Sequence, residues 1–145
     1  MAAFEPAGLL AGRCLLALLF LHEAWVKLSG YAGASRYAEA YGVPSGLLPL
    51  AIALELGGGL LLVAGLATRV IAFLLAGFCV VTAMIFHTEF SASGQLLHFE
   101  KDLAIAGGFL VLCWHGAGDW SLDRVLDASR RARQSGGIME TAKKG

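Results

Sequence analysis

Residues 46–86 read GLLPLAIALELGGGLLLVAGLATRVIAFLLAGFCVVTAMIF, and this stretch decides the fold class. It is apolar almost throughout, and only Glu55 and Arg69 carry a charge. A helix needs about 20 residues to cross the hydrocarbon layer of a membrane, whereas a barrel strand would show alternating polarity over about 10 residues. The continuous runs of Leu and Ala therefore predict two membrane-spanning helices, over 46–66 and 70–86, joined by a turn at 67–69.

Two further apolar runs flank this stretch, over residues 8–28 and 99–115, and we expect both to span the membrane. The first could be mistaken for a signal peptide. However, the segment before it, MAAFEPAG, contains no Lys or Arg, and Arg13 lies inside the apolar run. We interpret it as a retained helix. The predicted fold class is therefore all-α: an integral membrane four-helix bundle, with a short amphipathic C-terminal helix.

The composition supports a membrane protein and excludes several other classes. Of the 145 residues, 57% are hydrophobic and 15% are charged, and the mean hydropathy is +0.69. A soluble domain has roughly 45–50% apolar and about 25% charged residues. Eleven basic and eleven acidic residues cancel, which gives no basis for binding nucleic acid. The three Cys form no CxxC motif, so we predict neither a disulfide scaffold nor a metal site.

We divide the chain into a four-helix domain, 1–118, and a cytoplasmic tail, 119–145. Within the tail, residues 121–133 fit a short amphipathic helix, and Trp120 fits an anchor at the membrane surface. A short helix is also expected between Ala34 and Tyr41. Positive charges gather on the side that holds both termini and the 67–69 turn, and they predict that both termini are cytoplasmic. These residues are Arg69, Arg124, Arg130, Arg131, Arg133, Lys143 and Lys144.

Ionisable side chains within the spans are the candidate functional residues, because each costs at least about 2.5–3.5 kcal/mol near a helix centre. Glu55 lies near the expected midplane, where a carboxylate needs a cation, a proton or a water-filled cavity. Glu23 and Lys27 are one helical turn apart and can pair. All four spans contribute such residues to the outer half of the bundle. They are His22, Glu23, Lys27, Glu55, His87, His98, Lys101 and Asp102.

These residues predict a polar pocket in the outer leaflet, built on Glu55 with Lys27 and Glu23, and closed by Lys101 and Asp102. Such a pocket would suit a quinone, whose carbonyls need donors and whose reduced form needs a proton acceptor. The alternative is that the same charges are buried ion pairs that fix how the helices pack. His87 and His98, at the outer rim, are more typical of hydrogen-bonded surface residues than of metal ligands.

Arg13 stands apart from this group, because it lies about two helical turns from the inner surface. It could extend to the inner headgroups, as long cationic side chains often do. On a helical wheel it lies nearly opposite His22, so the two residues cannot both face the bundle centre.

Landmarks from about residue 8 to 127 resemble the DoxX family of small four-helix bacterial membrane proteins. The resemblance rests on their order and spacing, and one departure is Asp102, where the family often has Asn. The landmarks are Arg13, Lys27, GVP at 42–44, ELGGG at 55–59, GLATR at 65–69, His87, FEKDL at 99–103, GG at 107–108 and Gly116 to Asp123.

The resemblance implies a location in the bacterial inner membrane and a link to membrane oxidoreductases, one branch being a subunit of thiosulfate:quinone oxidoreductase. It points to Lys27, Glu55 and Lys101 as pocket residues. We therefore predict a quinone-binding subunit of a redox complex. Electrons would come from a partner protein, since the chain has no haem, flavin or iron–sulfur motif. These features do not decide whether the chain is itself an enzyme.

Two other functions stay open on the sequence alone. The chain could be a non-catalytic accessory or assembly subunit that packs against a larger membrane complex, using its Gly-rich faces. A carrier that uses Glu55 is the least favoured function, because the sequence shows no inverted repeat or broken helix. We expect contact with membrane lipid in every case, and a unit of this size often forms a homo-oligomer.

Overall fold

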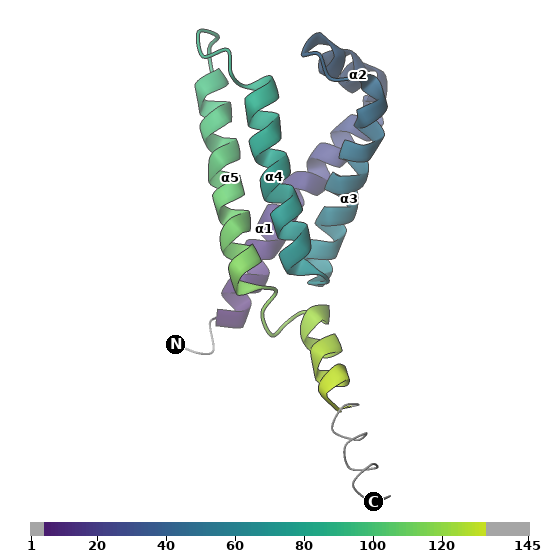
Figure 1. Ribbon diagram of the computed structural model, residues 1–145, viewed down its shortest axis with the longest axis vertical. Helices are drawn as coiled ribbons and strands as arrows, with labels where there is room; N and C mark the ends of the chain where they lie inside the picture. The colour runs from purple at the N-terminus through teal and green to yellow at the C-terminus, as the bar shows by residue number, and fades with distance from the viewer. Residues whose placement is uncertain (1–4, 133–145) are drawn as a thin grey trace, which may run out of the picture.

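The computed structural model describes residues 5–132, and its regular elements are all helical (Figure 1). They are α1 (Glu5–Ser29), α2 (Tyr31–Ala40), the 3-10 turn η1 (Ser45–Leu47), α3 (Leu48–Ala64), α4 (Thr68–Phe86) and α5 (Gln95–His115), followed by a helix over residues 122–132. No strand occurs between residues 5 and 132. The all-α prediction is therefore confirmed.

Three segments are long and apolar enough to cross a membrane: Pro6–Ser29, Ser45–Ala64 and Thr68–Phe86. Large apolar side chains on these helices face outward, including Leu15, Phe73 and Val81. The chain is thus a helical membrane bundle in contact with lipid. The fourth predicted span coincides with α5, whose first turns carry Glu100, Lys101 and Asp102 and are less apolar. Four crossings therefore stay a prediction.

The long helices associate in pairs, with α4 along α5 and α1 crossing α3 (Figure 1). The α3–α4 turn, the start of α1 and the end of α5 lie at one end of the bundle, together with residues 122–132. The α2 helix and the α4–α5 loop lie at the other end. Between the helices, Phe20 packs edge-on against Phe109, with ring centroids 5.3 Å apart. Small buried residues such as Ala17 and Ala76 let the backbones approach around this core.

Helix boundaries differ from the predicted ones mainly where polar residues continue a helix. The α5 helix begins at Gln95 rather than 99, and α2 begins at Tyr31 rather than Ala34. The α3 helix ends at Ala64 and is capped by Gly65, whose φ of +67° lies in the left-handed region that glycine adopts without steric cost. Within the predicted tail, the helix over 122–132 matches the expected 121–133, and residues 133–145 lie outside the described part of the chain.

Candidate functional site

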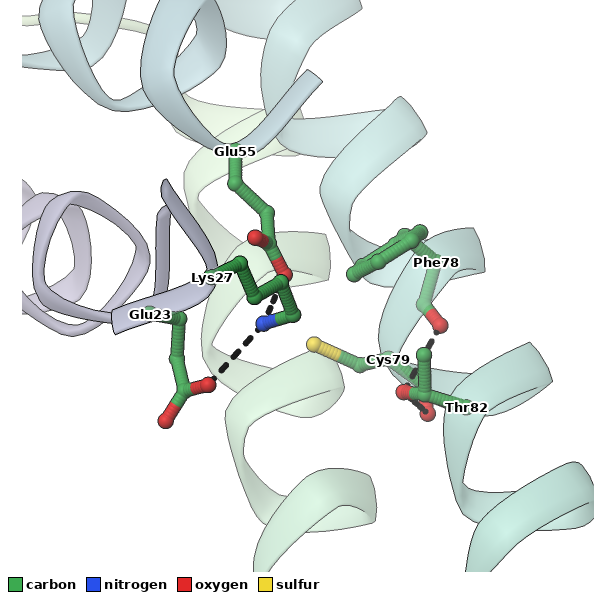
Figure 2. Close-up of polar contacts among 6 residues, drawn as sticks. All are labelled: Glu23, Lys27, Glu55, Phe78, Cys79 and Thr82. Atoms are coloured by element: carbon green, nitrogen blue, oxygen red, sulfur yellow. Dashed lines mark hydrogen bonds and ion pairs between the residues drawn. The ribbon is translucent and has the colours of Figure 1, made fainter. Parts of the chain in front are cut away.

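Three charged side chains from two helices form a connected cluster, which we call the Lys27 cluster (Figure 2). Glu23 and Lys27 are one turn apart on α1, and Glu55 lies on α3. The ammonium Nζ of Lys27 donates to Glu23 Oε2 and to Glu55 Oε1, both at 2.9 Å. The contacts expected between these residues are therefore present, and the packing of α1 on α3 is what creates the link to Glu55.

Exposure increases across the cluster from its interior to its rim. The side chain of Glu55 is 3% exposed, that of Lys27 is 23% exposed, and that of Glu23 is 48% exposed. A buried carboxylate is tolerated only when a cation or hydrogen bonds compensate for the water it has lost. Lys27 supplies that cation to Glu55, and Glu23 offsets part of the ammonium charge at the rim.

Two hydrogen-bonding positions in the cluster are left unused by the described residues. The second oxygen of the buried carboxylate, Glu55 Oε2, has no hydrogen-bond partner. An ammonium group has three donors, and Lys27 uses two of them on Glu23 and Glu55. The cluster can therefore both donate and accept one further hydrogen bond.

The α4 helix provides the facing wall, with Phe78, Cys79 and Thr82 on the side that looks toward the cluster (Figure 2). The Cys79 thiol is buried and points toward Lys27 and Glu55. The Thr82 hydroxyl is 3.0 Å from the carbonyl oxygens of Phe78 and Cys79, so its donor is used within its own helix. Phe78 also packs edge-on against Phe20, with ring centroids 6.4 Å apart. The charged cluster thus borders apolar and weakly polar surface.

A second polar group lies where α4 passes into α5. His87 Nδ1 is 2.7 Å from Gln95 Oε1, and His87 Nε2 is 3.9 Å from Asp102 Oδ2. The rings of His87 and His98 stack at 5.2 Å. Lys101 is exposed and forms no ion pair with another residue of the described range. Asp102 is therefore directed toward His87, and Lys101 contributes nothing to the Lys27 cluster.

A hydrogen-bond network that was not predicted from the sequence surrounds Arg13 at the opposite end of the bundle. Arg13 is buried, and its guanidinium donates to the carbonyl oxygens of Ala117, Trp120 and Val63, at 2.9 Å for Trp120 and 3.4 Å for Val63. It therefore binds the chain after α5 instead of reaching the headgroups. His22 is exposed, as expected for a residue on the opposite face of α1.

Asp123 completes the attachment of this segment. Its carboxylate accepts hydrogen bonds from the backbone N–H groups of Ala67, at 2.7 Å, and Thr68, at 2.9 Å. Its own N–H donates to Gly65 O at 2.9 Å. The first N–H groups of a helix need acceptors, and no side chain next to α4 in the sequence provides one. The lack of a capping side chain beside the start of α4 indicates that a distant residue must accept these hydrogen bonds. This was the feature of the sequence that could have pointed to Asp123.

No cluster of three or more His, Cys, Asp or Glu side chains able to hold a metal occurs within the part of the chain that the structure describes. Cys14, Cys79 and Cys113 are free thiols on three different helices.

Comparisons with known proteins give consistent matches. The DoxX family model matches residues 8–88. The inner membrane protein YqjF of Escherichia coli (strain K12) is 46% identical over 127 residues, which cover 88% of this chain and 98% of YqjF. The inner membrane protein YphA of the same strain is 33% identical over 129 residues, which cover 84% of this chain and 92% of YphA. No solved structure matches the chain.

Proposed function

The chain belongs to the DoxX family, and from that premise we propose that it is the quinone-binding membrane subunit of a redox complex in the bacterial inner membrane. The family and the membrane location of its relatives set the context. The proposal itself rests on the Lys27 cluster, a buried charge network that has hydrogen-bonding capacity left over. Ionisable residues inside a membrane commonly mark ion, proton or substrate sites.

One observation carries the proposal: Glu55 Oε2 is buried without a hydrogen-bond partner. An unsatisfied buried carboxylate oxygen is costly, typically by about 1–3 kcal/mol. A cluster that served only to join α1 and α3 would gain nothing from this arrangement. A ligand hydroxyl that donates to this oxygen would remove the cost, and the hydroxyls of a reduced quinone have that chemistry.

The residues of the cluster fit a quinone headgroup in complementary ways. The unused N–H of Lys27 would donate to a quinone oxygen, and Glu55 Oε2 would accept a proton from the hydroxyl of the reduced form. Glu23 would keep the charge of Lys27 balanced during this exchange. When bound, the quinone would supply a lipid-soluble carrier of two electrons and two protons. A partner protein would supply or take the electrons.

The route into the site would run from the membrane along the exposed edge of the cluster. Glu23 and Lys27 lie at that edge, while Glu55 lies behind them. The apolar wall of Phe78 and Cys79 would face the ring of the quinone, and the polar cluster would face its oxygens. This division of polar and apolar contacts is what a headgroup with an apolar tail requires.

The test is the amount of quinone that remains bound to the full chain purified from native membranes. We expect quinone in the unmodified protein and at least about a tenfold loss in Glu55→Gln, since a charge-assisted hydrogen bond disappears. Glu39→Gln is the matched control, because Glu39 is an exposed glutamate on α2. A protein that carries no quinone, or equal retention in both variants, would overturn the proposal.

Because Glu55→Gln also weakens the ion pair, a second variant separates binding from folding. Lys27→Met with Glu55→Leu removes both buried charges together and is expected to fold. Loss of quinone in this folded double variant supports the site. If the double variant retains quinone, the cluster serves only as a structural ion pair. That result would favour an accessory subunit over a quinone-binding one.

A further inference from the structure

A cavity of about 420 Å³ lies at the end of the bundle away from the Lys27 cluster. Three segments surround it: the start of α4, the chain that leaves α5, and the helix over 122–132 (Figure 1). Cavities of this size hold small molecules or headgroups. Its lining includes residues 67–70, 115–119, Ser121, Asp123, Arg124 and Asp127.

Most charges in the lining already have partners within the protein. Asp123 accepts the two N–H groups at the start of α4. Arg124 pairs with Asp119, with Nε and Oδ1 3.3 Å apart. Two charges are left, Arg69 and Asp127, and neither forms a hydrogen bond or ion pair with another residue of the described range 5–132. The cavity therefore presents one unpaired cation and one unpaired anion.

The wall of the cavity also contains an unused hydrogen-bonding group. Thr68 is fully buried, and its hydroxyl has no hydrogen-bond partner among the described residues. It directly precedes Arg69, so a donor and a cation lie together at the start of α4. Arg69 is exposed, and an anionic oxygen is the ligand group that its guanidinium would serve, whereas the Thr68 hydroxyl lies behind the cavity surface.

The cavity opens at the level where membrane helices meet the headgroups. Its lining includes the start of α4 and the end of α5. Two tryptophans flank it in the sequence, Trp114 at 83% exposure and Trp120 at 57% exposure. Exposed Trp is enriched at membrane–water interfaces, where its ring sits among the headgroups. Lipid headgroups are thus the ligands present at this height.

We propose that this cavity binds a phosphoethanolamine headgroup, with the phosphate on Arg69 and the ammonium on Asp127. The headgroup carries one anion and one cation, and it matches the two unpaired charges. An anionic headgroup without an amine would satisfy Arg69 and leave Asp127 without a partner. This inference is independent of the quinone site, because it uses other residues at the opposite end of the bundle.

The experiment measures lipid binding to the full chain, purified in detergent and delipidated, by native mass spectrometry. The probes are phosphatidylethanolamine, phosphatidylglycerol, and the soluble ions phosphoethanolamine and inorganic phosphate. We expect phosphatidylethanolamine to bind best and Arg69→Gln to weaken it about tenfold or more. Arg69→Lys should retain most of the binding. Asp127→Asn should remove the preference for phosphatidylethanolamine over phosphatidylglycerol while both still bind.

Arg130→Gln is the matched control for Arg69→Gln, because Arg130 is an exposed arginine on the 122–132 helix that does not line the cavity. Equal effects of Arg69→Gln and Arg130→Gln would overturn the proposal, as would a lack of preference between the two lipids. If soluble phosphoethanolamine binds as tightly as the lipid, the cavity recognises the same chemical group, and its ligand is a soluble molecule instead of a membrane lipid. Binding of inorganic phosphate alone would contradict the role given to Asp127.

Discussion

Glu55 illustrates what a membrane protein must provide for a buried carboxylate. Position along the chain predicted that Glu55 lies near the midplane, and the structure shows that its side chain is buried in the bundle. The spacing of four residues was enough to pair Glu23 with Lys27. The 2.9 Å contact between Lys27 and Glu55 depends on how α1 crosses α3, and no local pattern encodes that crossing. Sequence reasoning could therefore supply the candidate residues. It could not show that one carboxylate oxygen has a partner and the other has none.

For single residues, we predict that Lys27→Met lowers the free energy of unfolding by about 3 kcal/mol, because it leaves the buried carboxylate of Glu55 without a cation. Lys101→Met is the matched control and should change stability by less than about 0.5 kcal/mol, since Lys101 is exposed. Adding Glu55→Leu to Lys27→Met should recover most of the loss. The free energy of unfolding in detergent micelles measures all three. Equal values for the two lysine variants would contradict the prediction.

Arg13 shows a different way to keep a charge within a membrane bundle. Its donors bind backbone carbonyl oxygens of the segment after α5, at Ala117 and Trp120, and one carbonyl oxygen in the last turn of α3, at Val63. Carbonyl groups in the last turn of a helix have no partner within the helix, so the buried cation satisfies an acceptor there. The sequence indicated that Arg13 and His22 face opposite ways, which the structure confirms. It did not indicate that the chain after α5 folds back onto α1, because nothing local to residues 116–121 specifies that contact.

At the scale of the helices, the N-terminus of α4 is capped by a residue that lies far away in the sequence. Asp123 accepts the N–H groups of Ala67 and Thr68, although 56 and 55 residues separate them. We predict that Asp123→Ala costs about 1 kcal/mol, the usual value of an N-terminal cap. Asp127→Ala is the control, since Asp127 forms no hydrogen bond within the described residues. Hydrogen exchange should accelerate at Thr68 in the first variant alone, and unchanged protection there would refute the role of Asp123.

The turn between α3 and α4 leaves little room at Gly65. A Cβ there would lie 2.6 Å from Ser121 Cβ and 3.0 Å from Arg13 Cζ, and its φ of +67° costs about 1–2 kcal/mol for any other residue. We predict that Gly65→Ala releases the segment around Ser121, so that trypsin cleaves faster after Arg124. Gly57→Ala is the control, because its Cβ would meet nothing within 4 Å. Equal cleavage of both variants would contradict this account.

The observed ends of the helices show where hydropathy alone does not predict a helix boundary. The predicted spans were close for α3 and α4, since apolar runs end where their helices end. The α5 helix begins earlier than expected because Gln95 and His98 belong to its first turns despite their polarity. Polar residues are compatible with a helix that continues beyond an apolar segment, so the end of an apolar run does not fix the end of the helix.

For the whole molecule, the composition was sufficient to predict a helical membrane bundle, and the arrangement of the helices was not predictable. Apolar faces that meet lipid and apolar faces that meet other helices have similar sequences, because lipid tails are as apolar as leucine. The pairing of α1 with α3 and of α4 with α5 therefore emerges only in three dimensions. The cavity near Arg69 has the same origin, since three segments far apart in the sequence form it.

The topology gives the last prediction, that α5 crosses the membrane and leaves residues 122–132 on the cytoplasmic side. Arg13 bonds to Ala117, so the start of α1 and the end of α5 lie together, and arginines gather at that end. Single cysteines at Ser93 and Ser129, both exposed, are introduced after the native cysteines are replaced by alanine. An impermeant maleimide should label Ser93→Cys in intact spheroplasts and Ser129→Cys only after lysis. Labelling of both positions from one side would mean that α5 does not cross, and the reverse pattern would invert the orientation.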